Sequence, residues 1–89
     1  MSVLEDVADR MAQQALDVLE AQEDPSDDKV IRAVADAIGN ASPTLQEAFL
    51  TQVRIRRAER RGLAVLEAAS ARLAKAQADR AIGLPAPKG

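Results

Sequence analysis

The feature that most constrains this chain is a stretch from Pro43 to about Ile82 that has the composition of one uninterrupted helix. No proline follows Pro43 within it, and Gly62 is its only glycine. Because proline and glycine are the residues that most disfavour a helix interior, the stretch predicts a single α-helix of roughly 60 Å at 1.5 Å per residue. The rest of an 89-residue chain is too short to cover such a helix. Either the remainder wraps part of it, or a second copy shares it.

Two shorter helices are predicted before the long one. The first spans about residues 3–23, because Ser2 followed by Glu5 forms a capping box. The second spans about residues 27–38, with Ser26 or Asp27 as its cap. Their predicted buried faces follow helical spacing: Leu4, Val7, Met11, Ala15, Val18 and Leu19 in the first, and Val30, Ile31, Val34, Ala37 and Ile38 in the second.

Clear boundary signals separate the second helix from the third. Gly39-Asn40 predicts a left-handed C-terminal cap for the second helix. Ser42 then supplies the N-cap of the long helix, and Pro43 occupies its first position, where the missing N–H costs nothing. We therefore place the third helix at about residues 43–82.

These patterns predict an all-α protein, since no segment alternates in the manner of a strand. We expect one helical domain over residues 1–83, in which two shorter N-terminal helices pack on one long C-terminal helix, and a flexible tail at 84–89. Much of the 47% apolar content is alanine, which favours helix but buries little area. Such a core favours assembly into a helical-hairpin or coiled-coil-like oligomer.

The residue inventory excludes several functional classes. The chain contains no cysteine and no histidine, which removes disulfides, the usual zinc sites, thiol nucleophiles and the commonest general base. We therefore expect no catalytic residues, no metal site, no cofactor and no enzymatic activity. No run approaches the ~18 apolar residues of a membrane span, and the first ten residues lack a signal-peptide pattern. The sequence thus predicts a cytoplasmic protein with no membrane partner.

One side of the long helix carries a seam with the alternating four-and-three spacing of a coiled coil. Phe49 and Val53 flank it and are predicted to dock the first two helices. Small residues recur every seventh position and allow a partner helix to approach closely, which predicts that the chain associates with itself. The proposed oligomer seam consists of Ile55, Glu59, Gly62, Leu66, Ala69, Leu73 and Ala76.

Charge is divided unevenly along the chain. Residues 1–47 hold eleven acidic and three basic side chains, for a net charge of −8, whereas residues 48–89 hold three and nine, for +6. Five arginines fall within eight residues of the long helix, and guanidinium groups suit phosphate contacts. The predicted DNA-binding residues are Arg54, Arg56, Arg57, Arg60 and Arg61. The alternative, equally open from the sequence, is that the acidic first half neutralises them within the chain.

A second pattern has the spacing of a helix-turn-helix. Ala35, Gly39 and Leu45 occupy the positions of the close helix crossing, the turn and the second helix. In a DNA-binding version of this motif, the groove-facing residues would be Thr44, Gln46, Glu47 and Thr51. An ordinary helical corner has the same spacing, and the acidic residues before Arg54 favour that interpretation over a small transcriptional regulator.

The block SPTLQEAFLTQVRIRRAERRGLAVLEAA, within residues 42–73, resembles the small terminase subunits of tailed phages and of phage-like gene transfer agents. The resemblance implies a small, all-α, ring-forming protein that binds DNA and hands it to the large, ATP-hydrolysing terminase. It assigns the five arginines to a DNA-facing or assembly surface. Many members also have a separate N-terminal DNA-binding domain, for which this chain has no room. A helical protein-interaction adaptor, whose arginines meet acidic protein surfaces, is the alternative function.

Overall fold

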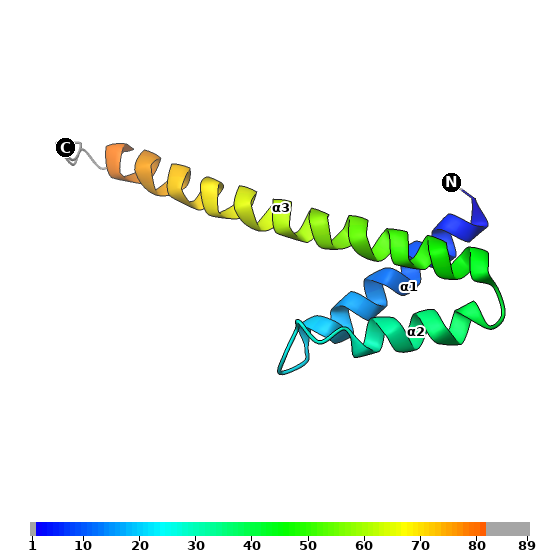
Figure 1. Ribbon diagram of the computed structural model, residues 1–89. Helices are drawn as coiled ribbons and strands as arrows, with labels where there is room; N and C mark the ends of the chain where they lie inside the picture. Colours follow the sequence, from blue (N-terminus) through cyan, green and yellow to red (C-terminus); the bar gives the residue numbers. More distant parts are fainter. Residues whose placement is uncertain (1, 82–89) are drawn as a thin grey trace. The chain divides into compact units, whose positions relative to one another are not determined.

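The structure is a computed structural model, and it describes residues 2–81. These residues form α1 (Val3–Glu20), α2 (Lys29–Gly39) and α3 (Pro43–Ala81), without a strand (Figure 1). The all-α prediction of two shorter helices before one long helix is therefore confirmed. Ile82, the predicted end of the third helix, and the predicted tail at 84–89 lie outside the described residues. None of the three helices, as far as they are described, is long and apolar enough to span a membrane.

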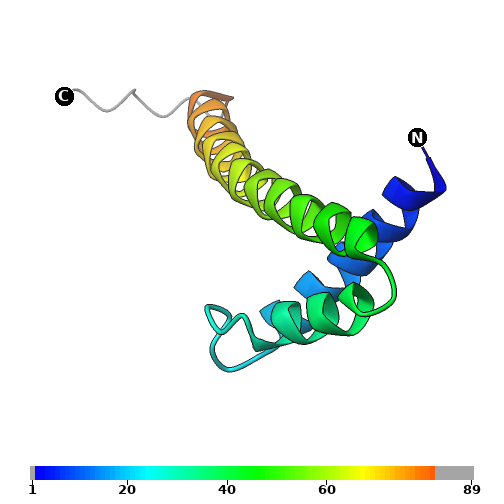
Figure 2. The same ribbon diagram turned by 45° about the vertical axis from the view of Figure 1, so that its right-hand side comes forward.

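Two compact units divide the chain, with the boundary inside α3. The first, Met1–Ala58, is called the N-terminal unit here, and the second, Glu59–Gly89, the C-terminal unit. In the N-terminal unit, α1 and α2 lie beside each other and the beginning of α3 packs on both (Figure 2). In the C-terminal unit, the described residues belong to α3 alone.

The core of the N-terminal unit draws on all three helices. Phe49 and Val53 of α3 are 0% and 3% exposed, which confirms them as the docking point for the first two helices. Apolar burial of this kind contributes about 25 cal/mol per Å², so the large Phe49 ring is a main anchor of the unit. The core cluster consists of Ala12, Ala15, Leu16, Leu19, Ile31, Ala35, Phe49 and Val53.

The buried face of α1 is rotated from the predicted one. Val18, predicted to be buried, is 52% exposed, whereas Ala8 and Ala12 are both 0% exposed. Hydropathy favours the larger Val and Met side chains. The helix instead turns its alanines inward, because small side chains let helices approach more closely than the usual 8–10 Å allows for large ones. On α2, Ile31 and Ala35 are buried, and the predicted Ala37 is exposed.

The N-caps of α1 and α3 match their predictions. Ser2 Oγ accepts a hydrogen bond from the Glu5 backbone N–H at 3.2 Å. Ser42 Oγ accepts one from the Leu45 backbone N–H at 3.1 Å, with Pro43 as the first helical residue. Both serines thus satisfy a backbone donor that the first turn of a helix leaves without a partner.

The ends that face the α1–α2 loop differ from the prediction. α1 ends at Glu20 rather than near residue 23, and α2 begins at Lys29 rather than 27. Asp28 stands at the N-cap of α2 without a capping hydrogen bond from its side chain. That carboxylate accepts from Arg57 of α3, and the local hydrogen bond to the first N–H of α2 comes from Asp27 Oδ1, at 3.1 Å from the Lys29 nitrogen.

The C-terminal end of α2 corrects a further prediction. Gly39 belongs to the helix, and Asn40 after it is right-handed, with φ −65° and ψ −31°, so no left-handed cap forms. The glycine instead leaves room for the end of the Gln46 side chain. A Cβ at position 39 would lie 2.8 Å from Gln46 Cδ and nearer still to Nε2. Gln46 Nε2 donates to the Ala35 carbonyl oxygen at 2.9 Å, which joins the two helices across this corner.

This arrangement predicts that positions 39 and 46 are coupled. Gly39→Ala alone should leave stability near the wild-type value, because the helix-propensity gain of up to about 1 kcal/mol is offset by loss of the Gln46 hydrogen bond, about 1 kcal/mol. In a Gln46→Ala background the same substitution should stabilise by about 0.5–1 kcal/mol. Urea unfolding of the four proteins measures the coupling. An identical effect of Gly39→Ala in both backgrounds would contradict it.

Candidate functional site

The arginine run of α3 does not form one uniform surface. Arg54, Arg56 and Arg57 belong to the N-terminal unit, and Arg60 and Arg61 to the C-terminal unit. Arg54 and Arg61 are exposed, while the other three are half-buried. The two kinds of residue therefore have to be considered separately.

Arg56 forms a two-pronged ion pair with α1. Its Nε donates to Asp9 Oδ1 at 2.6 Å and its Nη2 to Asp9 Oδ2 at 2.7 Å. Gln13 Nε2 donates to the same carboxylate at 2.9 Å. The Arg56 hydrogen bonds, followed by that of Gln13, hold the pKa of Asp9 below its ordinary value. Two parallel N–H···O bonds fix both position and orientation, so this pair ties α1 to α3.

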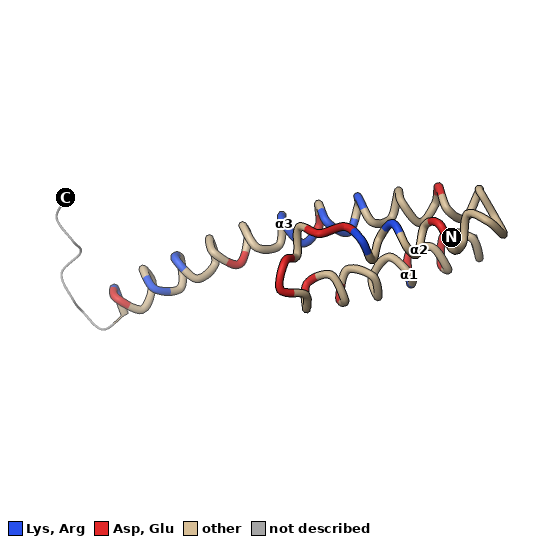
Figure 3. Tube along the Cα trace, turned by 60° about the horizontal axis from the view of Figure 1, so that its bottom comes forward, with Lys and Arg blue, Asp and Glu red and all other residues tan. Residues whose placement is uncertain are grey.

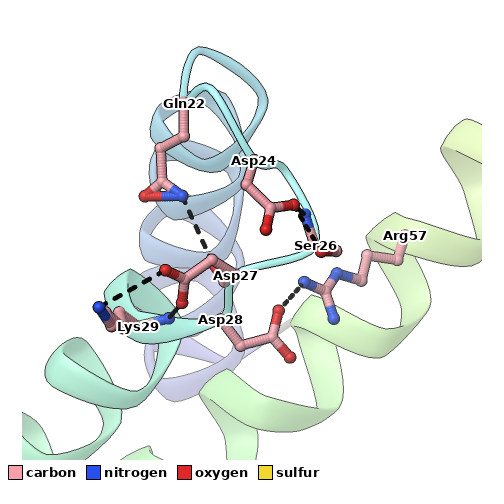
Figure 4. Close-up of polar contacts among 7 residues, drawn as sticks. All are labelled: Gln22, Asp24, Ser26, Asp27, Asp28, Lys29 and Arg57. Atoms are coloured by element: carbon pink, nitrogen blue, oxygen red, sulfur yellow. Dashed lines mark hydrogen bonds and ion pairs between the residues drawn. The ribbon is translucent and has the colours of Figure 1, made fainter.

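Arg57 pairs with the loop that enters α2. Its Nη2 donates to Asp28 Oδ1 at 2.5 Å (Figure 4). That hydrogen bond lowers the pKa of Asp28, and the nearby positive charge of Arg32 lowers it further. In the same loop Asp24 Oδ1 accepts from Ser26 Oγ at 2.5 Å, and Asp27 Oδ1 accepts from the Lys29 N–H at 3.1 Å. The loop is thus ordered by carboxylates, one of which engages α3.

For Arg56 and Arg57, the neutralisation alternative describes what the structure shows. Each guanidinium contacts a carboxylate of the acidic first half, and neither side chain is more than 31% exposed. A phosphate group would have to compete with Asp9 or Asp28 for these residues. Arg54 and Arg61 keep the exposure that contact with a large anionic partner needs.

A groove of about 460 Å³ opens beside Arg57 within the N-terminal unit. Its lining is mixed: the apolar side chains are Ile31, Leu50 and Val53, the cationic ones Arg32, Arg54 and Arg57, and the remaining ones Ser26, Asp27 and Asp28. Arg32 was absent from the sequence prediction. It lies on α2, outside the arginine run, and only the packing of α2 against α3 brings it to the same groove as Arg54 and Arg57.

The predicted oligomer seam lies mostly in the C-terminal unit, where its residues are exposed to solvent. Every residue from 61 to 78 is exposed, including Leu66 at 64% and Leu73 at 57%. A Cβ added at Gly62 would meet no atom within 4 Å, so the absence of a side chain there leaves open surface on the helix. Ile55, the one seam residue in the N-terminal unit, is 53% exposed. The apolar side chains thus form a helix face that the described residues leave accessible.

A cationic face runs along the same unit and was only partly predicted. Arg61 and Arg72 are eleven residues apart, close to three full turns, so they share one side of α3 about 16.5 Å apart. Lys75 lies one turn beyond Arg72, and all three side chains are exposed. Basic residues recur along this part of the tube in Figure 3. Sequence reasoning concentrated on the dense run at 54–61 and missed its sparse continuation.

The helix-turn-helix interpretation is corrected at one of its four residues. Gln46 is half-buried and bonded to α2, rather than directed outward for contact with a base. Thr44, Glu47 and Thr51 are exposed. Gln46, which was predicted to contact a DNA base, instead joins α2 and α3 by a hydrogen bond, as in an ordinary helical corner.

No group of acidic side chains among residues 2–81 has the arrangement of a metal site. No protein-family model matches the sequence, and comparisons with curated proteins and with solved structures gave no match. The function of the chain is therefore inferred from its side chains.

The Asp9–Arg56 pair predicts a pH-dependent contribution to stability. A carboxylate whose pKa is lowered by folding stabilises the folded state above the ordinary Asp pKa of about 3.9, and loses this effect as pH falls through the lower folded value. Asp9→Asn should therefore be less stable than wild type at pH 7, and the difference should shrink by pH 3. Urea unfolding at several pH values measures the free energy of unfolding.

Asp36→Asn provides the matched control, since Asp36 is an exposed carboxylate of α2. This variant should track wild type across the same pH range. If Asp9→Asn also tracked wild type at pH 7, the pair would contribute nothing to the stability of the N-terminal unit.

Proposed function

We propose that this chain is a non-enzymatic, homo-oligomeric DNA-binding protein of the cytoplasm. In its role it would act like a small terminase subunit, presenting duplex DNA to a large terminase. The observation that carries the proposal is the C-terminal unit. There a single helix exposes an apolar seam along one side and a cationic face along another.

Self-association follows from the energetics of that helix. An isolated helix owes little of its stability in water to propensity alone and depends on packing of an apolar face. The seam offers such a face, with two leucines more than half exposed and small residues between them. Contiguous exposed apolar surface of this kind is typical of protein interfaces. A second copy carries the same seam and supplies the simplest partner.

DNA binding is supported by the distribution of charge. The C-terminal unit has six Lys and Arg residues against three Asp and Glu, a net charge of +3, whereas the N-terminal unit has six against eleven, or −5. Arg61, Arg72 and Lys75 lie on one exposed side of α3. Three phosphate contacts give weak affinity on their own. Oligomerisation multiplies them on one assembly, and linked weak contacts bind much more tightly than single ones.

The structure changes which arginines we assign to DNA. Arg56 and Arg57 are engaged with Asp9 and Asp28, so their main role is to hold the N-terminal unit together. From the predicted set, Arg61 is the proposed phosphate contact in the C-terminal unit, and Arg72 and Lys75 extend this contact surface along α3. Because these residues contact phosphates rather than base edges, binding should be weakly sequence-specific and strongly salt-dependent.

A charge-matched pair of double variants tests this assignment. Arg61→Ala with Arg72→Ala should weaken binding to a fluorescent duplex at 50 mM salt and lower the slope of log K against log salt by about 2 per chain, about 1 for each lost contact. Arg10→Ala with Lys29→Ala removes the same charge from exposed positions of the N-terminal unit. It should leave that slope unchanged.

Equal losses in the two double variants would mean that only net charge matters and would remove the proposed face. Absence of any binding by the wild type at low salt would exclude the DNA function. The groove lined by Arg32, Arg54 and Arg57 over Ile31 and Leu50 favours the adaptor function in that case. Its three arginines outnumber the two carboxylates Asp27 and Asp28, and together with the apolar side chains they would suit an acidic, partly apolar peptide.

A further inference from the structure

The seam of the C-terminal unit alternates large and small residues in a regular way. Leu66 and Leu73 occupy one set of positions seven residues apart, and Gly62, Ala69 and Ala76 occupy the other, which the larger Ile55 continues toward the N-terminus. Glu59 and Arg80 continue the leucine set at its two ends. This regularity bears on how two copies pair, because parallel and antiparallel helices bring different members of the two sets together.

Side-chain size favours the antiparallel arrangement. In a parallel pair each position meets its own equivalent in the second copy. Leucine therefore packs against leucine, while the layers formed by glycine or alanine from both copies are left underfilled. In an antiparallel pair the two sets face each other, and each leucine packs on a glycine or alanine of the other copy. Large side chains opposite small ones fill space evenly and let the axes approach at the short end of the 8–10 Å range.

Charge favours the same arrangement. A parallel pair places Glu59 against Glu59 and Arg80 against Arg80, and both contacts repel. When Leu73 faces Gly62 of the second copy and Leu66 faces its Ala69, Glu59 falls opposite Ala76. About one turn from Ala76 lie Arg72 on one side and Asp79 and Arg80 on the other, so cations outnumber carboxylates around Glu59. Opposed helix dipoles add a small favourable contribution.

From these two observations we infer that the seam pairs with a second copy of this chain in the antiparallel direction, with Leu73 facing Gly62 and Leu66 facing Ala69. The inference rests on the proposed self-association and specifies its geometry. It also places the two cationic faces of the pair with opposite polarity, so that a pair presents the same surface in both directions along a duplex.

Directed disulfide formation tests the direction, because the chain has no cysteine of its own. Gly62→Cys and Leu73→Cys chains are prepared separately, mixed, allowed to exchange and gently oxidised. In the antiparallel register, positions 62 and 73 face each other, and equivalent positions are about 16.5 Å apart along the axis. That separation exceeds the Cα distance of about 7 Å that a disulfide tolerates. Covalent dimer should form in the mixture and be absent from either variant oxidised alone.

A second pair of cysteine variants repeats the test without removing a leucine of the seam. Glu59→Cys mixed with Ala76→Cys keeps Leu66 and Leu73 and should give the same result. Covalent dimer from Gly62→Cys alone would show a parallel pair and overturn the inferred direction, while self-association and DNA binding would stand. A wild-type chain that associates but gives no cross-link with either mixture would overturn the seam itself. A monomeric wild-type chain would end the proposed self-association as well.

Discussion

The core of the N-terminal unit is small and covers only the beginning of α3, and the rest of the structure depends on this constraint. Two short helices supply enough apolar surface to bury Phe49 and Val53, and these are the only buried residues of α3 among those described. Beyond them α3 continues to Ala81 with leucines and a valine exposed. A helix of this length with an alternating apolar seam gains its stability from packing, and packing requires a partner surface. The functional proposals follow from that requirement.

The charged side chains are arranged differently in the two units. In the N-terminal unit, the acidic residues of α1 and of the loop before α2 engage arginines of α3, through Asp9 with Arg56 and Asp28 with Arg57. These pairs orient three helical segments whose apolar core combines alanines with Leu16, Leu19, Ile31, Phe49 and Val53. In the C-terminal unit, basic residues outnumber acidic ones along the exposed helix. An arginine cluster that looks uniform in sequence therefore contains two residues paired within the N-terminal unit, Arg56 and Arg57, and two exposed residues, Arg54 and Arg61.

Local signals were predictable, and the signals that depend on tertiary contact were not. Ser42 and Pro43 predict the start of α3 correctly, because capping depends on neighbouring residues alone. The seam was visible because its period lies within one helix. Asp9 and Arg56 are separated by 47 residues, and nothing in the sequence indicates that they meet. The predicted buried face of α1 was right for Ala15 and Leu19 and wrong for Val18, because hydropathy ranks Val18 above Ala12, whereas close helix packing selects the alanine. Gly39 was assigned a backbone role, although the constraint is the space that Gln46 occupies.

The most direct test of this account is the molar mass of the wild-type chain in solution, measured by light scattering across a range of concentrations and at two salt concentrations. The account predicts an assembly of two or more copies, at a multiple of the 9.5 kDa chain mass. The assembly should persist at moderate salt, because apolar contacts along the seam hold it together and salt screens only the charges. A mass of one chain at every concentration would contradict the claim that a second copy completes α3.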